Sequence, residues 1–215
     1  MNPLGNTPQT SLRLAVLLLA AGEGSRLGSH PKALLKKDGQ SLLNHFCTAL
    51  APFNPVELVI VTGFHADLIE SEIHAIQKSS ALPIFIVRNL FSKEGQAKSV
   101  RLGLESLQSE FDVLMVALSD QPRIGAPEIE ALLHEYSQKE GGQEVILPLV
   151  EGQRGNPILF SNAAVKDVLA TPRMVCRQYM DKYPEIVRIM PSDLQGYVLD
   201  VDTFDDIQRE KLTLS

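Results

Sequence analysis

The sequence predicts a three-layer α/β fold, in which a mainly parallel, twisted sheet lies between two layers of helices. Continuous apolar runs rich in Val, Ile and Leu recur at 14–20, 57–61, 83–87, 112–118 and 144–150. Unbroken runs of this kind are typical of strands buried on both faces. Segments with apolar residues at intervals of three and four lie between them, and this is the spacing of one helix face. Alternating strand and helix patterns indicate βαβ units with right-handed crossovers.

The length and composition indicate one folded domain. The chain has 215 residues, and domains usually contain about 100–200. Hydrophobic residues make up 44% of it and charged residues 21%, which argues against intrinsic disorder. We therefore expect a single domain over residues 13–215, preceded by a flexible leader over residues 1–12, where polar and turn-forming residues predominate.

The charge balance restricts the partners. The chain has 20 Lys and Arg residues against 26 Asp and Glu residues, a net charge of −6, and no segment concentrates the basic ones. Nucleic acids and anionic membranes both require a basic surface, so we expect neither as a partner. The apolar run at 14–20 is far shorter than the roughly 20 residues of a membrane span. Cys47 and Cys176 form no CxxC pattern, which favours buried, reduced thiols and a cytoplasmic location.

A loop of small residues follows the first expected strand. Ala20, Ala21, Gly22 and Gly24 have little or no side chain, so the backbone amides there can approach a ligand closely. In open α/β sheets, ligands bind at the carboxyl ends of the strands. The sequence therefore predicts a binding loop, although a glycine-rich turn that only reverses the chain is the alternative.

Two cations, Arg26 and Lys32, belong to the same loop, and small residues with cations suit a triphosphate. The P-loop pattern requires Lys directly after its last Gly, but Ser29 follows Gly28. The dinucleotide pattern requires Gly or Ala where Leu27 stands. These two differences disfavour both a P-loop NTPase and a nicotinamide oxidoreductase.

Helices are expected between the strands and near the end of the chain. Apolar spacing marks one face on each of four helices, formed by Leu42, Leu43, Phe46 and Leu50; Leu68, Ile69, Ile73 and Ile76; Ala97, Val100, Leu104 and Leu107; and Ile129, Leu132, Leu133 and Tyr136. The last third is less regular. It predicts short strands at 157–160, 185–190 and 197–199, and helices at 161–170, 173–182 and 203–212.

Gly95 and Ser99 lie at the start of the third of these helices. A glycine before a helix allows a ligand to contact the backbone, and a serine in the first turn suits a contact to a base or a ribose. A plain helix start explains the glycine equally well, so both interpretations stay open.

Two acidic residues follow expected strands. Asp120 comes after the run at 112–118, and Asp202 follows the short strand at 197–199. Mg²⁺ is commonly held by one or two carboxylates together with substrate phosphates, so this pair predicts a magnesium site. The alternative for Asp120 is a turn or a helix cap. Asp205 and Asp206 are better suited to the positive end of the last helix.

The sequence Gly155-Asn156-Pro157 leads into another expected strand. It is either a turn that contacts an acceptor substrate or the start of a hairpin. The five histidines show no metal-ligand spacing, and we expect them to be solvated or core residues.

The order of these motifs resembles a known family. LAAGEGSRLG with Pro31-Lys32, then Asn89 with Gly95 and Ser99, then SDQP, RGNPILF and DVDT, is similar to the MobA-like NTP transferases. Within that family the molybdenum cofactor cytidylyltransferases are the most similar, and the resemblance covers roughly residues 14 to 206. It implies a Rossmann-like nucleotidyltransferase fold.

The resemblance also implies a role for each motif. Ala20, Ala21 and Gly22 would contact the base, Gly24, Arg26 and Lys32 the triphosphate, and Gly95 and Ser99 would complete the nucleotide pocket. Asp120 and Asp202 would hold Mg²⁺, and Arg26, Lys32 and Asp120 would act in catalysis. The acceptor would contact Gln121, Gly155, Asn156 and Pro157.

The implied activity is the Mg²⁺-dependent transfer of CMP from CTP to a phosphate-bearing acceptor, with release of pyrophosphate. The Ala-Ala-Gly loop is similar to the cytidylyl type, and the implied acceptor is molybdopterin. GTP as the donor, or a sugar or alcohol phosphate as the acceptor, are the alternatives of the same class. An alternative of another class is a regulator that binds a nucleotide without catalysis.

Overall fold

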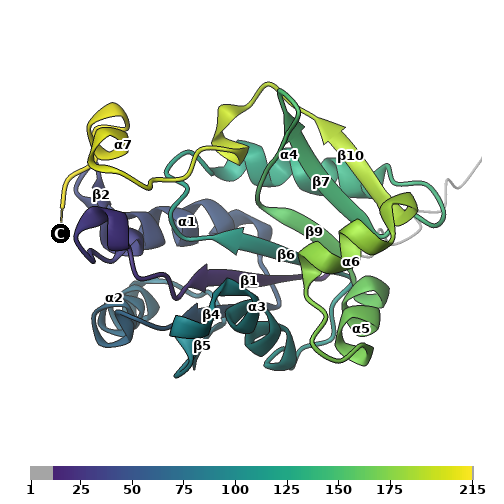
Figure 1. The fold of residues 1–215 in the computed structure, drawn as a ribbon, viewed down its shortest axis with the longest axis horizontal. Coiled ribbons are helices and arrows are strands. Elements are labelled where there is room, and N and C mark those ends of the chain that lie inside the picture. Colours follow the sequence, from purple (N-terminus) through teal and green to yellow (C-terminus); the bar gives the residue numbers. More distant parts are fainter. Residues whose placement is uncertain (1–11, 215) are drawn as a thin grey trace, which may run out of the picture.

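The computed structural model describes residues 12–214, which form a mainly parallel sheet between two layers of helices (Figure 1). The three-layer α/β fold expected from the sequence is confirmed. The strands of the sheet are β1 (Leu14–Ala20), β4 (Glu57–Thr62), β5 (Ile84–Arg88), β6 (Val113–Leu118), β7 (Val145–Val150), β8 (Gln153–Arg154), β9 (Ile158–Ser161) and β10 (Val187–Pro191). Strands β2 (Lys36–Lys37) and β3 (Gln40–Ser41) form a separate small sheet.

The strand order determines where a ligand can bind. The order is β10-β7-β9-β6-β1-β4-β5, and β8 pairs with β7. Strand β9 runs antiparallel to β6 and β7, whereas β1 is parallel to both β4 and β6. The chain passes from β1 to β4 and β5 on one side and then returns to β6 on the other. The carboxyl ends of β1 and β6 therefore lie at a reversal of strand order, where open α/β sheets bind their ligands.

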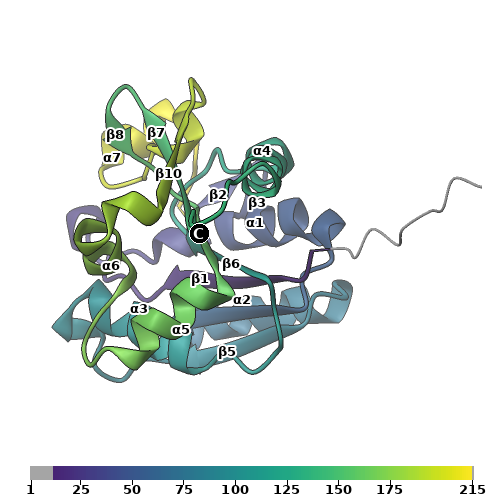
Figure 2. The same ribbon diagram turned by 90° about the vertical axis from the view of Figure 1, so that its right-hand side faces the viewer.

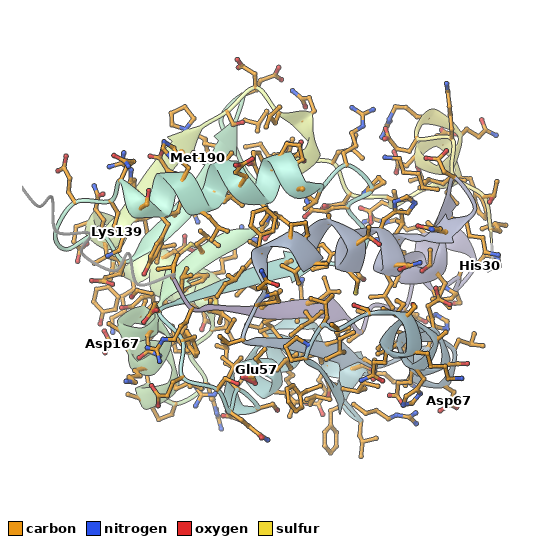
Figure 3. The ribbon with its side chains drawn as sticks, turned by 180° about the vertical axis from the view of Figure 1, so that it is seen from behind. His30, Glu57, Asp67, Lys139, Asp167 and Met190 are labelled. Atoms are coloured by element: carbon orange, nitrogen blue, oxygen red, sulfur yellow. The ribbon has the colours of Figure 1, made fainter. Side chains whose placement is uncertain are left out.

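Helices cover both faces of the sheet (Figures 1 and 2). They are α1 (Leu42–Leu50), α2 (Ala66–Ser79), α3 (Gln96–Glu105), α4 (Ala126–Ser137), α5 (Asn162–Ala170), α6 (Cys176–Lys182) and α7 (Phe204–Arg209). Helices α1, α2 and α4 contribute to one buried core, and α3, α5 and α6 contribute to the other. Figure 3 looks onto the first of these layers, with α1 and α4 in front of the sheet.

The central strand β1 is buried along its whole length because it contributes to both cores. Val16 and Leu18 pack into one core, and Leu17 and Leu19 pack into the other. Gly103 lets α3 approach β1 closely, since a Cβ there would lie 2.3 Å from Cδ1 of Leu17. This approach packs the C-terminal half of α3 against the middle of β1.

Some element boundaries differ from the expectation. The strand expected at 197–199 is wrong, because Tyr197 ends a 3₁₀ turn (Gln195–Tyr197) instead. Its backbone carbonyl accepts hydrogen bonds from Gln121 and Asn156, so it is used by neighbouring loops and not by a strand partner. The helices expected at 173–182 and 203–212 are shorter and comprise Cys176–Lys182 and Phe204–Arg209.

Three further expectations concern the two cysteines, the leader and the membrane. Cys47 and Cys176 are both buried and free, as predicted. The expected leader lies, except for its last residue, outside the described residues. The division into a leader and one domain therefore stays a prediction. No helix within residues 12–214 has the length and apolarity needed to cross a bilayer.

Candidate active site

A cavity of about 450 Å³ opens at the carboxyl ends of β1 and β6, beside the start of α3. Most of the nucleotide and metal residues predicted from the sequence line it. These are Ala20, Ala21, Gly22, Gly24, Arg26, Lys32, Ser99, Asp120 and Asp202. The fold thus brings together residues from four separate segments of the chain.

The loop after β1 folds back tightly at Gly24. This residue has a φ of 67°, in the left-handed region, and its carbonyl accepts hydrogen bonds from the amides of Leu27 and Ser29. A Cβ at Gly24 would lie 2.1 Å from the carbonyl oxygen of His30. Glycine is therefore required here by both conformation and space, and the turn places Arg26 at the cavity.

Lys32 joins the two predicted metal ligands. It begins a 3₁₀ turn (Lys32–Leu34), and its Nζ lies 2.9 Å from Oδ2 of Asp120 and 2.5 Å from Oδ1 of Asp202. Nη1 of Arg26 lies 3.2 Å from the other carboxylate oxygen of Asp202. Two carboxylates and two cationic side chains from distant parts of the sequence thus form one charged cluster at the edge of the cavity.

The cluster perturbs the protonation of its members. Burial lowers the pKa of Lys32, but attraction to Asp120 and hydrogen bonds to Asp202 and Asp120 outweigh burial, so the pKa lies above its usual value. The pKa of Asp200 is raised to about 6, first by burial and then by the negative charges of Asp120 and Asp202, although part of its surface is exposed. The sequence analysis assigned no role to Asp200, because its proximity to Asp120 arises only on folding.

A short C-terminal segment positions Asp202. The amide of Val201 donates a hydrogen bond of 3.0 Å to the carbonyl of Asp120, which fixes the two segments to each other. The amide of Asp202 donates to the carboxylate of Asp206, which also accepts from Thr203 at the start of α7. This network sets the backbone of Asp202 at the cavity.

The same segment packs on the binding loop through a third, separate core. Its members are Leu27, Leu35, Leu42, Val201, Ile207 and Leu212. Backbone hydrogen bonds of 2.9 Å between Lys36 and Thr213 close this region, where α7, β2 and the loop after β1 lie side by side (Figure 1). Arg26 and Asp202 therefore belong to one small packed unit.

Ser99 is held by Asn89, a residue to which the sequence analysis assigned no role in the pocket. It is 3% exposed, and its Oγ accepts a hydrogen bond of 2.9 Å from Nδ2 of Asn89. Oδ1 of Asn89 accepts from the amide of Phe91, so Asn89 ties the loop after β5 to α3. Phe64 after β4, Ser92 after β5 and Gln96 at the start of α3 also line the cavity. Their positions after neighbouring parallel strands were the available signal.

Gly95 does not line the cavity. It has a φ of 102° and connects a 3₁₀ turn (Ser92–Glu94) to α3. This geometry fits the interpretation of Gly95 as a helix start, and its contact with a nucleotide stays a prediction.

The four residues expected to contact an acceptor also lie outside the lining of the cavity. Gln121 is buried and donates to the carbonyl of Tyr197, while its Oε1 has no hydrogen-bond partner within residues 12–214. The amide of Asn156 donates to the same carbonyl, and a Cβ at Gly155 would lie 2.8 Å from Tyr197. Pro157 follows Asn156 and precedes β9. Their role toward an acceptor stays a prediction.

The carboxylates of Asp120 and Asp202 suit a hard divalent cation such as Mg²⁺, which prefers oxygen ligands. Both lie within hydrogen-bond distance of one Nζ, so their oxygens converge on a common point. Residues 12–214 contain no group of three or more His, Cys, Asp or Glu side chains placed to hold a metal. A metal at this pair would need water or substrate phosphate to complete its ligand shell.

The fold and the placement of the cavity are those of the nucleotidyltransferase class. The chain matches the family model of the MobA-like NTP transferase domain over residues 16–183, which is most of its length. It belongs to this family, and the family expected from the sequence is confirmed.

Individual proteins are similar to this chain in sequence or in fold. The chain is 30% identical over 209 residues to 2-C-methyl-D-erythritol 4-phosphate cytidylyltransferase of Streptomyces coelicolor, covering 94% of this chain and 75% of that protein. It is 38% identical over 63 residues to the bifunctional protein GlmU of Francisella philomiragia, covering 29% of this chain and only 14% of that protein. A Mycobacterium tuberculosis H37Rv protein solved in complex with manganese superposes with a TM-score of 0.63 at 19% identity, covering 92% of this chain and 97% of that one.

Proposed function

We propose that the protein transfers CMP from CTP to a phosphate-bearing small molecule and releases pyrophosphate, with Mg²⁺ bound at Asp120 and Asp202. The observation that carries this proposal is the cluster at the cavity edge, where Lys32 lies within 2.9 Å of both carboxylates. Such a cluster combines cations for a triphosphate with oxygen ligands for its metal. The cavity has room for one nucleotide, with the small residues of the loop after β1 along one side.

In this proposal the protein acts mainly by positioning and by charge compensation. An oxygen of the acceptor phosphate attacks the α-phosphorus of CTP, a new P–O bond forms, and the bond to the β-phosphate oxygen breaks. Pyrophosphate leaves with the electron pair of that bond. Arg26 and Lys32 offset the charge of the two phosphate groups and of the leaving pyrophosphate, and a bound divalent metal would supply Lewis-acid charge stabilisation.

CTP is our proposed donor for two reasons. The Ala20-Ala21-Gly22 segment lines the cavity, so its backbone is available to a base, and this segment is similar to the cytidylyl type. The relative from Streptomyces coelicolor, which matches almost the whole chain, is named a cytidylyltransferase. A screen of CTP, GTP, UTP, ATP and dTTP by thermal shift with Mg²⁺ tests the donor. Selective stabilisation by CTP supports the proposal, and selective stabilisation by GTP contradicts it.

Molybdopterin is the acceptor implied by the order of the sequence motifs, and we propose it as the first acceptor to test. A phosphorylated alcohol is the second candidate, because the cytidylyltransferase relative is named for a methylerythritol phosphate substrate. Pyrophosphate release with each acceptor separates the two. Binding of CTP without pyrophosphate release for either acceptor would instead favour a regulator that binds nucleotide without catalysis.

A further inference from the structure

The ammonium group of Lys32 lies between the two carboxylates that we assign to a metal. The side chains of Lys32 and Asp120 are each only 20% exposed, so their interaction is partly shielded from water. Asp120 follows β6, whereas Asp202 belongs to the C-terminal segment. Without a cation between them, these two negative charges would repel each other at short range. Lys32 therefore supplies the positive charge that this position requires.

Both carboxylates already have cationic partners without a metal. Asp120 and Asp202 carry two negative charges, and Lys32 and Arg26 contact them with two positive ones. A divalent cation joining the carboxylates beside Lys32 would lie a few ångströms from an ammonium group, where repulsion is strong in a partly buried site. A triphosphate changes this balance, because it offers the ammonium group another anionic partner.

The small number of protein ligands also favours a metal that enters together with a nucleotide. Two carboxylates leave most positions around an octahedral metal to other donors, and substrate phosphates commonly fill them for Mg²⁺. A metal that arrives with a triphosphate thus brings both its missing ligands and a new partner for Lys32.

We propose that Lys32 is an electrostatic latch that excludes free divalent metal from Asp120 and Asp202 until a nucleotide is present. In the nucleotide-free protein its ammonium group holds the two carboxylates together, and it moves onto the triphosphate when the metal enters with the nucleotide. This inference rests on the proposed function and extends it to the order of binding, in which metal and nucleotide enter together.

Mn²⁺ alone is the probe that tests the latch, with free Mn²⁺ measured by electron paramagnetic resonance in the absence of nucleotide. We expect Lys32→Met to bind Mn²⁺ at least about tenfold more tightly than the wild type, because a positive charge is removed close to the metal. Lys36→Met is the matched control. It removes the same charge from an exposed side chain on the neighbouring β2, and we expect its affinity to stay within about twofold of the wild type.

Thermal unfolding gives a second readout in case Lys32→Met is unstable. We expect Mn²⁺ alone to raise the Tm of Lys32→Met more than that of the wild type, since the metal replaces the lost cation between the carboxylates. Asp120→Asn in the Lys32→Met background should remove both the gain in affinity and the gain in Tm. Equal or weaker Mn²⁺ binding by Lys32→Met overturns the latch.

A third comparison separates the latch from the proposed function. If Lys32→Met binds Mn²⁺ no more tightly but Asp120→Asn still weakens the binding of Mn²⁺ with CTP, the latch is wrong and the metal site stands. If Asp120→Asn leaves the binding of Mn²⁺ with CTP unchanged, both the metal site and the latch are wrong.

Discussion

Nζ of Lys32 and Oδ1 of Asp202 lie 2.5 Å apart, although 170 positions separate these residues in the chain. One residue follows the first strand, and the other belongs to the segment before the last helix. The contact shows that the C-terminal segment completes the charged cluster at the cavity.

Replacing Asp120 with Asn should lower kcat by about 10² or more. The substitution keeps the size of the side chain but removes a charge that would help hold the metal, and losing one preorganised electrostatic group has an effect of this size. Steady-state pyrophosphate release measures it. Asp205→Asn serves as the control, because Asp205 is exposed on α7 and does not line the cavity. Near-normal turnover of Asp120→Asn would exclude Asp120 from the mechanism.

Replacing Gly24 with Ala should disrupt the binding loop, whereas Gly28→Ala should have a much smaller effect. Both glycines have a φ above 60°, so both substitutions introduce the same kind of backbone strain. Only at Gly24 does the new Cβ also meet a carbonyl oxygen, at 2.1 Å, because nothing lies within 4 Å at Gly28. Calorimetric titration with CTP and Mg²⁺ measures the loss. Equal affinities of the two variants would show that the tight turn at Gly24 is not needed for binding.

Replacing Leu212 with Ala should reduce activity beyond its effect on stability. Leu212 belongs to the third core, which connects the loop bearing Arg26 to the segment bearing Asp202. Leu132→Ala in α4 is the matched control, since it removes the same atoms from another buried core. Both substitutions should destabilise the protein by about 2–5 kcal/mol. Only Leu212→Ala should lower kcat/KM by about tenfold or more under conditions where both variants are folded, because small displacements of catalytic groups have large effects. Equal kcat/KM values would contradict the role of this core.

Glu70 should contribute to stability at neutral pH but not in acid. A hydrogen bond from Arg88 lowers the pKa of Glu70, and Thr62 donates another to the same carboxylate. A carboxyl group whose pKa is lower in the folded protein stabilises it above the unfolded pKa, and this contribution is lost as pH falls through the folded value. We expect Glu70→Gln to lower the Tm by roughly 2–4 °C at pH 7, as for the loss of about 1 kcal/mol. The two Tm values should converge as the pH falls from 7 through and below the ordinary pKa of a Glu carboxyl, about 4.3. A constant difference across this range would contradict the assignment.

The sequence predicted the fold through its most regular features. The buried run at Leu14–Ala20 contributes to two cores at once, so it shows no alternation, and it is found as the central strand. The strand expected at 197–199 is wrong because Tyr197 is buried by contacts with a distant loop and with helix α4, and not by strand pairing. An apolar triplet cannot distinguish these two causes of burial.

The candidate site was predictable where a residue follows a strand. The residues after β1 and Asp120 after β6 line the cavity because parallel strands place their carboxyl ends at one edge. The contact between Lys32 and the carboxylates depends on the packing of the third core, which sequence spacing does not encode. The same limit applies to Asn89, whose bond to Ser99 joins two loops that are adjacent only in the folded chain.

The most direct test of the central claim is the fate of the α-phosphate of CTP. Wild-type protein is incubated with Mg²⁺, CTP labelled at the α-phosphate and a panel of phosphorylated acceptors that includes molybdopterin. The account predicts that label appears in one acceptor in an amount equal to the pyrophosphate released, that Asp120→Asn slows both by about 10² or more, and that removal of Mg²⁺ abolishes both. CTP that binds but transfers no label to any acceptor, or transfer by Asp120→Asn at a near-normal rate, would contradict it.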